Sequence, residues 1–142
     1  MVFRNDFSGT LPSEMGEMTD LWRLDVAENK IGGRIPPELG NLTNLGMLYL
    51  HENKFVGTFP NEIGHKIPLL EEVWFYNNDF TGTVPIGLGN HSRITSILAH
   101  GNKFTGNVSQ LLCDNEAFYE MMDFTTDCFS ALVDCECCFR CY

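Results

Sequence analysis

An asparagine recurs along the sequence every 24 or 25 residues, and this period constrains the possible fold more than any other feature. An apolar side chain follows each asparagine by two positions, and a glycine follows it by four. A period of this length indicates a solenoid, in which successive units bury a continuous core between them. The asparagines are Asn5, Asn29, Asn53, Asn78 and Asn102; the apolar residues are Phe7, Ile31, Phe55, Phe80 and Phe104; the glycines are Gly9, Gly33, Gly57, Gly82 and Gly106.

Three apolar positions precede the asparagine in each complete unit, and the last two are separated by a single residue. Such alternation places side chains on opposite faces of a β-strand, so we expect one short strand per unit. The asparagine that follows has both an amide donor and a carbonyl acceptor, so a stack of them can satisfy backbone groups in the turns. The apolar positions are Leu21, Leu24 and Val26; Leu45, Leu48 and Leu50; Leu70, Val73 and Phe75; and Ile94, Ile97 and Ala99.

The unit from Leu21 to Leu42 reads Leu-xx-Leu-x-Val-xx-Asn-x-Ile-x-Gly-x-Ile-Pro-xx-Leu-Gly-x-Leu, and it resembles the plant-type leucine-rich repeat. The resemblance covers residues 1–112 in about five copies, the first of them incomplete. It implies an α/β repeat solenoid, a right-handed coil with a concave parallel β-sheet and an irregular or 3-10 convex side. One copy has an extra residue around His65 to Pro68, which we expect in the convex loop.

The repeat ends after Leu112, and residues 113–142 are predicted to form a cysteine-rich C-terminal cap with a short helix over residues 116–122. An even number of cysteines, in a family that is commonly extracellular, favours disulfides. Zinc bound by the Cys-x-Cys-Cys-xx-Cys cluster is the alternative. The first unit starts in mid-strand without the family's usual N-terminal cap, so we expect a segment of a longer protein. The cysteines are Cys113, Cys128, Cys135, Cys137, Cys138 and Cys141.

The outward positions of the expected strands carry aromatic and acidic side chains. Neighbouring parallel strands lie about 4.8 Å apart, so Tyr49, Trp74 and Leu98 form one column, and Phe3, His51, Tyr76 and His100 form the next. Aromatic residues are enriched at binding hot spots, which predicts a ligand-binding surface on the concave face; alternatively, the rings merely stack and shield the sheet. Tyr76 separates the two histidines, so we expect no shared metal. The predicted ligand-binding residues are Tyr49, His51, Glu52, Glu72, Trp74, Tyr76, Leu98 and His100.

Other classes of function find little support in the sequence. It contains no nucleophile elbow, metal-binding helix motif or phosphate loop, so we expect neither catalysis nor a cofactor. With 19 acidic and 9 basic residues the formal charge is -10, which disfavours nucleic-acid binding. No apolar run approaches the roughly 20 residues of a membrane span, although a longer parent protein could be membrane-anchored. Asn41, Asn90 and Asn107 begin glycosylation sequons, which we expect to lie outside the strands.

These features together predict a protein- or peptide-recognition module, part of an extracellular or cell-surface receptor-like protein that binds through its concave face. Two alternatives remain open. One is a secreted inhibitor of a cell-wall hydrolase, similar to polygalacturonase inhibitors, whose acidic face would complement a basic enzyme. The other is an intracellular scaffold with a zinc-binding cysteine tail.

Overall fold

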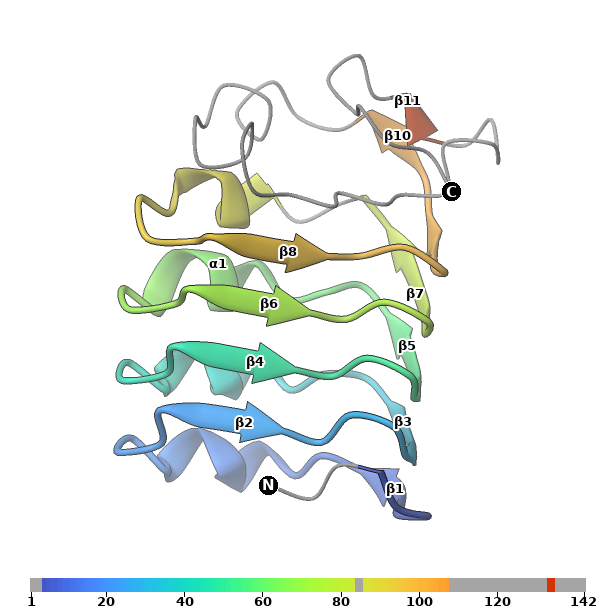
Figure 1. Ribbon diagram of the computed structural model, residues 1–142, viewed down its shortest axis with the longest axis horizontal. Coiled ribbons are helices and arrows are strands. Elements are labelled where there is room, and N and C mark those ends of the chain that lie inside the picture. The colour runs from blue at the N-terminus through green and yellow to red at the C-terminus, as the bar shows by residue number, and fades with distance from the viewer. Residues whose placement is uncertain (1–3, 84–85, 108–132, 135–142) are drawn as a thin grey trace.

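A computed structural model describes residues 4–83, 86–107 and 133–134 of the chain, and these residues form a stack of coils (Figure 1). Successive coils contribute to a four-stranded parallel sheet in the order β2-β4-β6-β8. This sheet corresponds to the concave sheet that the sequence predicts, and we call it the concave sheet. Its strands are β2 (Arg23–Asp25), β4 (Met47–Tyr49), β6 (Glu72–Trp74) and β8 (Ser96–Leu98).

A second parallel sheet follows the asparagines and runs along the neighbouring side of the stack, in the order β1-β3-β5-β7-β9 (Figure 1). A further short pair, β10 (Gly106–Asn107) with β11 (Val133–Asp134), is also parallel. Parallel pairing throughout the described coils confirms the predicted leucine-rich-repeat solenoid. The strands of the second sheet are β1 (Ser8–Thr10), β3 (Lys30–Gly33), β5 (Lys54–Gly57), β7 (Asp79–Gly82) and β9 (Lys103–Phe104).

Short helical turns form the side of the stack that carries neither sheet. Three of them are five-residue 3-10 helices, η1 (Ser13–Glu17), η2 (Pro37–Asn41) and η3 (Ile86–Asn90). The unit with the extra residue instead has a six-residue α-helix, α1 (Asn61–Lys66). The extra residue thus falls on the convex side, where a longer turn changes neither sheet.

The ladder asparagines connect the coils through their side chains. The amide of Asn78 donates to the carbonyl oxygens of Phe75 and Tyr76 in its own coil and of Leu50 in the preceding one, while its Oδ1 accepts from the Phe55 N–H at 3.0 Å. Asn29, Asn53 and Asn102 each accept the corresponding N–H of the coil before them and donate to their own coil. Each side chain thereby satisfies turn groups that would otherwise be buried without partners.

The apolar positions of all the described coils merge into one core. Leu48, Leu50, Phe55, Phe75 and Phe80 are fully buried, and the Phe75 and Phe80 rings meet edge to face at 5.9 Å. Burying each such side chain contributes about 1.5–3 kcal/mol relative to leaving it exposed. The core therefore holds both sheets in fixed positions and gives the outward-facing side chains a rigid base. The predicted cysteine cap and the helix over residues 116–122 lie outside the described residues.

Candidate ligand-binding surface

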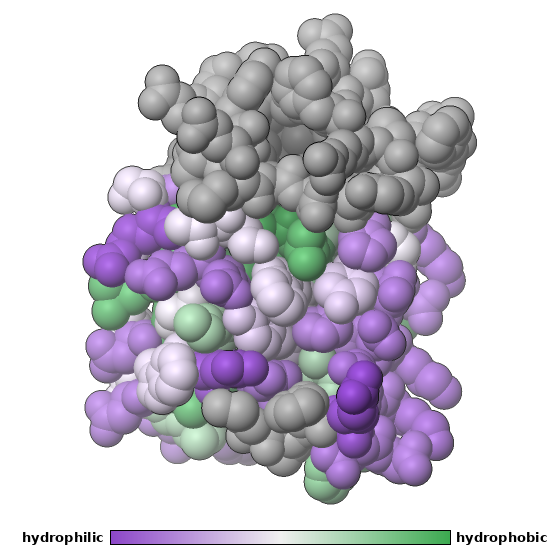
Figure 2. Space-filling model, viewed as in Figure 1, coloured by the Kyte–Doolittle hydropathy of each residue, from purple (hydrophilic) through white to green (hydrophobic). Residues whose placement is uncertain are grey.

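The register of the concave sheet sets the outward side chains in columns. Tyr49 pairs with Trp74, and Trp74 pairs with Leu98, so these three residues occupy one column across three strands. His51, Tyr76 and His100 follow two residues later in the same coils and occupy the next column. Figure 2 views this face and shows pale and green residues in its middle, between purple hydrophilic margins.

Within each column the rings lie face to face. Tyr49 and Trp74 stack with centroids 4.4 Å apart, His51 and Tyr76 at 4.5 Å, and Tyr76 and His100 at 4.6 Å. These distances match the spacing of neighbouring strands, which is about 4.8 Å. The ring faces therefore cover one another, and a ligand would meet mainly ring edges and polar tips.

The eight predicted side chains differ in exposure, and this corrects the expectation that all of them are open to a ligand. Tyr49 and His51 are only 7% and 8% exposed. Glu72, Trp74, Tyr76, Leu98 and His100 are partly exposed, and Glu52 is exposed. Neighbouring side chains bury the two rings, so the accessible part of the surface centres on β6, β8 and the Glu52 turn.

A polar cluster holds the buried end of the Tyr49 column. The guanidinium of Arg23 lies over the Tyr49 ring at 4.9 Å and bonds to Asp25 Oδ2 at 2.7 Å, while the Tyr49 hydroxyl donates to Glu72. Burial, followed by the Glu72 carboxylate, raises the pKa of Tyr49 to about 12. The phenol therefore remains a donor, and Trp74 is held similarly by its Nε1–H bond to Ser96 Oγ at 2.9 Å.

Burial disfavours the charged forms of His51 and Tyr76 in the second column. Burial lowers the pKa of His51 despite the opposing effect of the Glu52, Asp25 and Glu28 carboxylates, and burial raises the pKa of Tyr76. The buried His51 Nδ1 has no hydrogen-bond partner in the part of the chain that the structure describes. Tyr76 lies between the two histidines, and no group of three or more metal-binding side chains occurs among the described residues.

A feature that the sequence reasoning missed is a row of residues with left-handed backbone at the end of the concave strands. Its members have φ between 51° and 64°, and we call them the left-handed row. Only its last two residues, Asn77 and Gly101, are of types that favour this conformation. These two residue types were the only indication of the row in the sequence. Arg4 Nε bonds to Glu28 Oε2 at 2.8 Å within the row. The row consists of Arg4, Glu28, Glu52, Asn77 and Gly101.

The sequons fall in three different settings. Asn41 ends η2 with an exposed side chain, and Asn90 ends η3. Asn107 lies in β10, where it pairs with Asp134, so the expectation that all three lie outside strands is wrong for Asn107. The sequence reasoning missed this strand because its partner lies beyond the repeats. A separate hollow of about 410 Å³ next to Arg34 and Phe59 includes none of the predicted ligand-binding residues.

Comparisons with known proteins agree with this architecture. The family model "Leucine Rich Repeat" matches residues 20–42. The structure of PEPR1-AtPEP1 is 30% identical over 88% of the chain with a TM-score of 0.78, and the plant peptide hormone receptor RGFR1 in complex with RGF2 is 29% identical over 94% with a TM-score of 0.79. The chain is built of leucine-rich repeats and is similar in fold to the plant receptor RGFR1.

Another similar structure is the leucine-rich-repeat ectodomain of the Arabidopsis thaliana membrane receptor kinase GASSHO1/SCHENGEN3 in complex with CASPARIAN STRIP INTEGRITY FACTOR 2, with 25% identity, 94% coverage and a TM-score of 0.79. The chain spans only 15–20% of the length of the three chains to which it was compared. No curated protein sequence matches it. Among its described residues, no helix is both long and apolar enough to cross a membrane.

Proposed function

We propose that this leucine-rich repeat protein is a non-catalytic recognition module of an extracellular receptor-like protein, and that it binds a peptide or protein ligand on its concave sheet. The observation that carries the proposal is the pair of stacked ring columns, whose members Trp74, Tyr76 and His100 remain partly exposed. Rings already held by stacking lose little side-chain entropy when a ligand binds. The similar receptor structures support this reading, since RGFR1 is a peptide hormone receptor in complex with RGF2.

The columns also favour a ligand that lies across several coils. Each column runs perpendicular to the strands, so Trp74 and Leu98, or Tyr76 and His100, present neighbouring groups on successive coils. An extended segment lying across the strands would meet these groups in turn. Binding energy in such interfaces concentrates in a few aromatic residues, so Trp74 and Tyr76 should dominate.

The test is selection of a random peptide display library on the full chain, followed by affinity measurement of the enriched peptides. We expect the double substitution Trp74→Ala and Tyr76→Ala to weaken their binding at least about tenfold, because each truncation removes a hot-spot ring. The matched control is Val56→Ala with Thr81→Ala, two exposed positions on the second sheet. Circular dichroism must show the native fold in both variants.

Two results would contradict the proposal. Absence of any enriched peptide, or equal affinity of both double variants, would place recognition elsewhere on the molecule. Retention of purified basic cell-wall hydrolases, with inhibition of their activity, would instead support the hydrolase-inhibitor alternative, for which the charge of -10 supplies the complementarity.

A further inference from the structure

The left-handed row contains an internal example of how its carboxylates bind a cation. Arg4 donates to Glu28 across one coil step at 2.8 Å, and the pKa of Arg4 is raised by the hydrogen bond and charge of Glu28 and further by the charge of Glu52. Both carboxylates therefore act on a guanidinium that lies at this edge of the concave sheet. Glu28 is paired with the Arg4 cation, and Glu52 lies one coil further along the same row.

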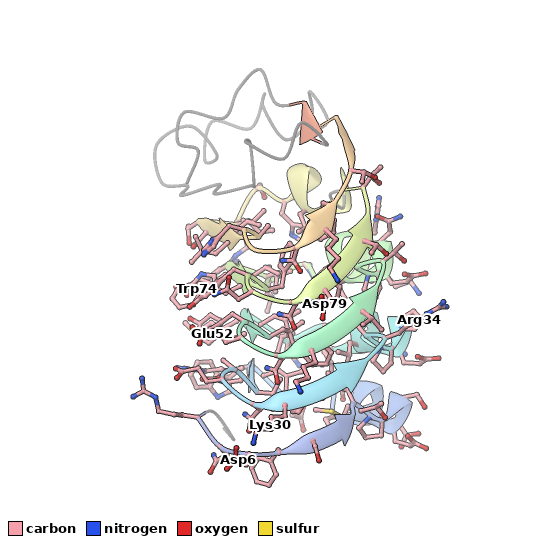
Figure 3. The ribbon with its side chains drawn as sticks, turned by 90° about the vertical axis from the view of Figure 1, so that its right-hand side faces the viewer. Asp6, Lys30, Arg34, Glu52, Trp74 and Asp79 are labelled. Carbon is pink, nitrogen blue, oxygen red and sulfur yellow. The ribbon has the colours of Figure 1, made fainter. Side chains whose placement is uncertain are left out.

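Backbone hydrogen bonds fix the spacing of this row. The N–H of Glu28 donates to the carbonyl oxygen of His51, and the N–H of Glu52 donates to that of Tyr76, each at 3.0 Å. Both glutamates are thereby tied to the ring column of the following coil. The backbone of Glu52 consequently lies next to the column of His51, Tyr76 and His100. Figure 3 shows Glu52 and Trp74 on the same side of adjacent coils, away from Arg34.

Glu52 forms no direct ion pair among the described residues, although its charge acts on Arg4 from a distance. Its side chain is exposed and makes no ion pair there, and the next row members, Asn77 and Gly101, are uncharged. Burial lowers the pKa of the adjacent His51 imidazole and disfavours its charged form, and its buried Nδ1 lacks a hydrogen-bond partner among residues 4–83, 86–107 and 133–134. Three described arginines, by contrast, are already paired, namely Arg4 with Glu28, Arg23 with Asp25 and Arg93 with Glu71.

We propose that Glu52 binds the positively charged side chain of a basic ligand segment whose aliphatic stem packs against the edges of the Tyr76 and His100 rings. The ring faces are occupied by stacking, so the contact uses the methylene groups of an arginine or lysine and leaves its charge at the carboxylate. The net charge of -10 attracts a basic segment from solution. This inference rests on the proposed function and specifies the chemistry of the ligand.

The test uses two small probes, acetyl-Gly-Arg-Gly-amide and the same peptide with citrulline, which has the same shape but no charge. In an NMR titration of the full chain, we expect the arginine peptide to shift the amide signals of Glu52, Asn53 and Asn77, and the citrulline peptide to bind at least about fivefold more weakly, the scale of an exposed ion pair. Glu52→Gln should remove this preference. Glu38→Gln, an equal charge change at an exposed position of η2, should retain it.

The outcomes separate this inference from the proposed function. If Glu52→Gln leaves the affinity for the arginine peptide unchanged, or if the citrulline peptide binds equally well, Glu52 is not a cation site. The library peptides could still depend on Trp74 and Tyr76, in which case the recognition surface stands and only its preference for basic segments fails. If the protein shows neither the preference for the arginine peptide nor the dependence of the library peptides on Trp74 and Tyr76, both proposals are wrong.

Discussion

At the scale of single residues, Asn78 shows how one polar side chain joins two coils. It is almost fully buried, its amide donates to three carbonyl oxygens, and its Oδ1 accepts the Phe55 N–H. Without this side chain the buried Phe55 N–H would lack its acceptor, whereas each of the three carbonyl oxygens also accepts a second hydrogen bond. Asn44, in contrast, is exposed and donates from Nδ2 to the Thr19 carbonyl oxygen at 2.9 Å.

Replacing Asn78 by alanine should therefore lower the free energy of unfolding by about 3 kcal/mol, because leaving one buried group unsatisfied costs about 1–3 kcal/mol. Asn44→Ala is the control and should change it by less than about 0.5 kcal/mol, because water can replace its bond. Urea unfolding followed by circular dichroism measures both values. Equal losses of unfolding free energy in the two variants would show that burial of the ladder asparagines adds nothing to stability.

The same scale shows what the sequence could and could not predict. The asparagine period and the column of Tyr49, Trp74 and Leu98 follow directly from counting residues, because the spacing of parallel strands is fixed. The burial of Tyr49 and His51 could not be predicted, because it depends on how neighbouring side chains fold over them. The left-handed backbone at Glu52 was also hidden, since glutamate seldom has positive φ.

At the scale of elements, the convex helices stack closely because each contains a glycine at the contact. A Cβ built on Gly16, Gly40 or Gly64 would lie within 2.9 Å of the helical turn of the next coil. At Gly64 in α1 the obstructing atoms are the carbonyl carbon of Gly87 at 2.5 Å and the backbone nitrogen of Leu88 at 2.7 Å. Backbone atoms cannot rotate away as a side chain can, so the approach of α1 to η3 requires glycine.

Gly64→Ala should consequently lower the free energy of unfolding by about 1–3 kcal/mol, the usual cost of overpacking. The control is Gly46→Ala, where the nearest atoms to a Cβ are carbonyl oxygens at 3.6 and 3.7 Å and φ is not positive. That substitution should be neutral or slightly stabilising, because alanine restricts the unfolded chain. Thermal and urea unfolding measure the stability of both variants. A Gly64→Ala variant at least as stable as Gly46→Ala would show that the close approach of α1 to η3 does not require glycine.

At the scale of the whole molecule, each coil touches only its immediate neighbours, so stability depends on position along the stack. Phe7 and Met18 in the first described coil are 52% and 51% exposed. Phe55 and Leu42, at the same repeat positions in later coils, are fully buried. Identical repeat positions thus contribute differently because a central coil is covered on both sides.

Native-state hydrogen exchange should therefore show increasing protection from the first coil to the third. The Arg4 amide, bonded to the Ala27 carbonyl oxygen, should exchange through local opening, whereas the Leu50 amide, bonded to Trp74, should require opening of the whole stack. Leu11→Ala, which truncates a buried side chain in the first coil at a cost of about 2–5 kcal/mol, should speed exchange at Arg4 far more than at Leu50. Ile35→Ala, at the matching position of the second coil, should speed exchange at Leu50 as well. Equal acceleration of both amides by Leu11→Ala would instead mean that the coils unfold as a single cooperative unit.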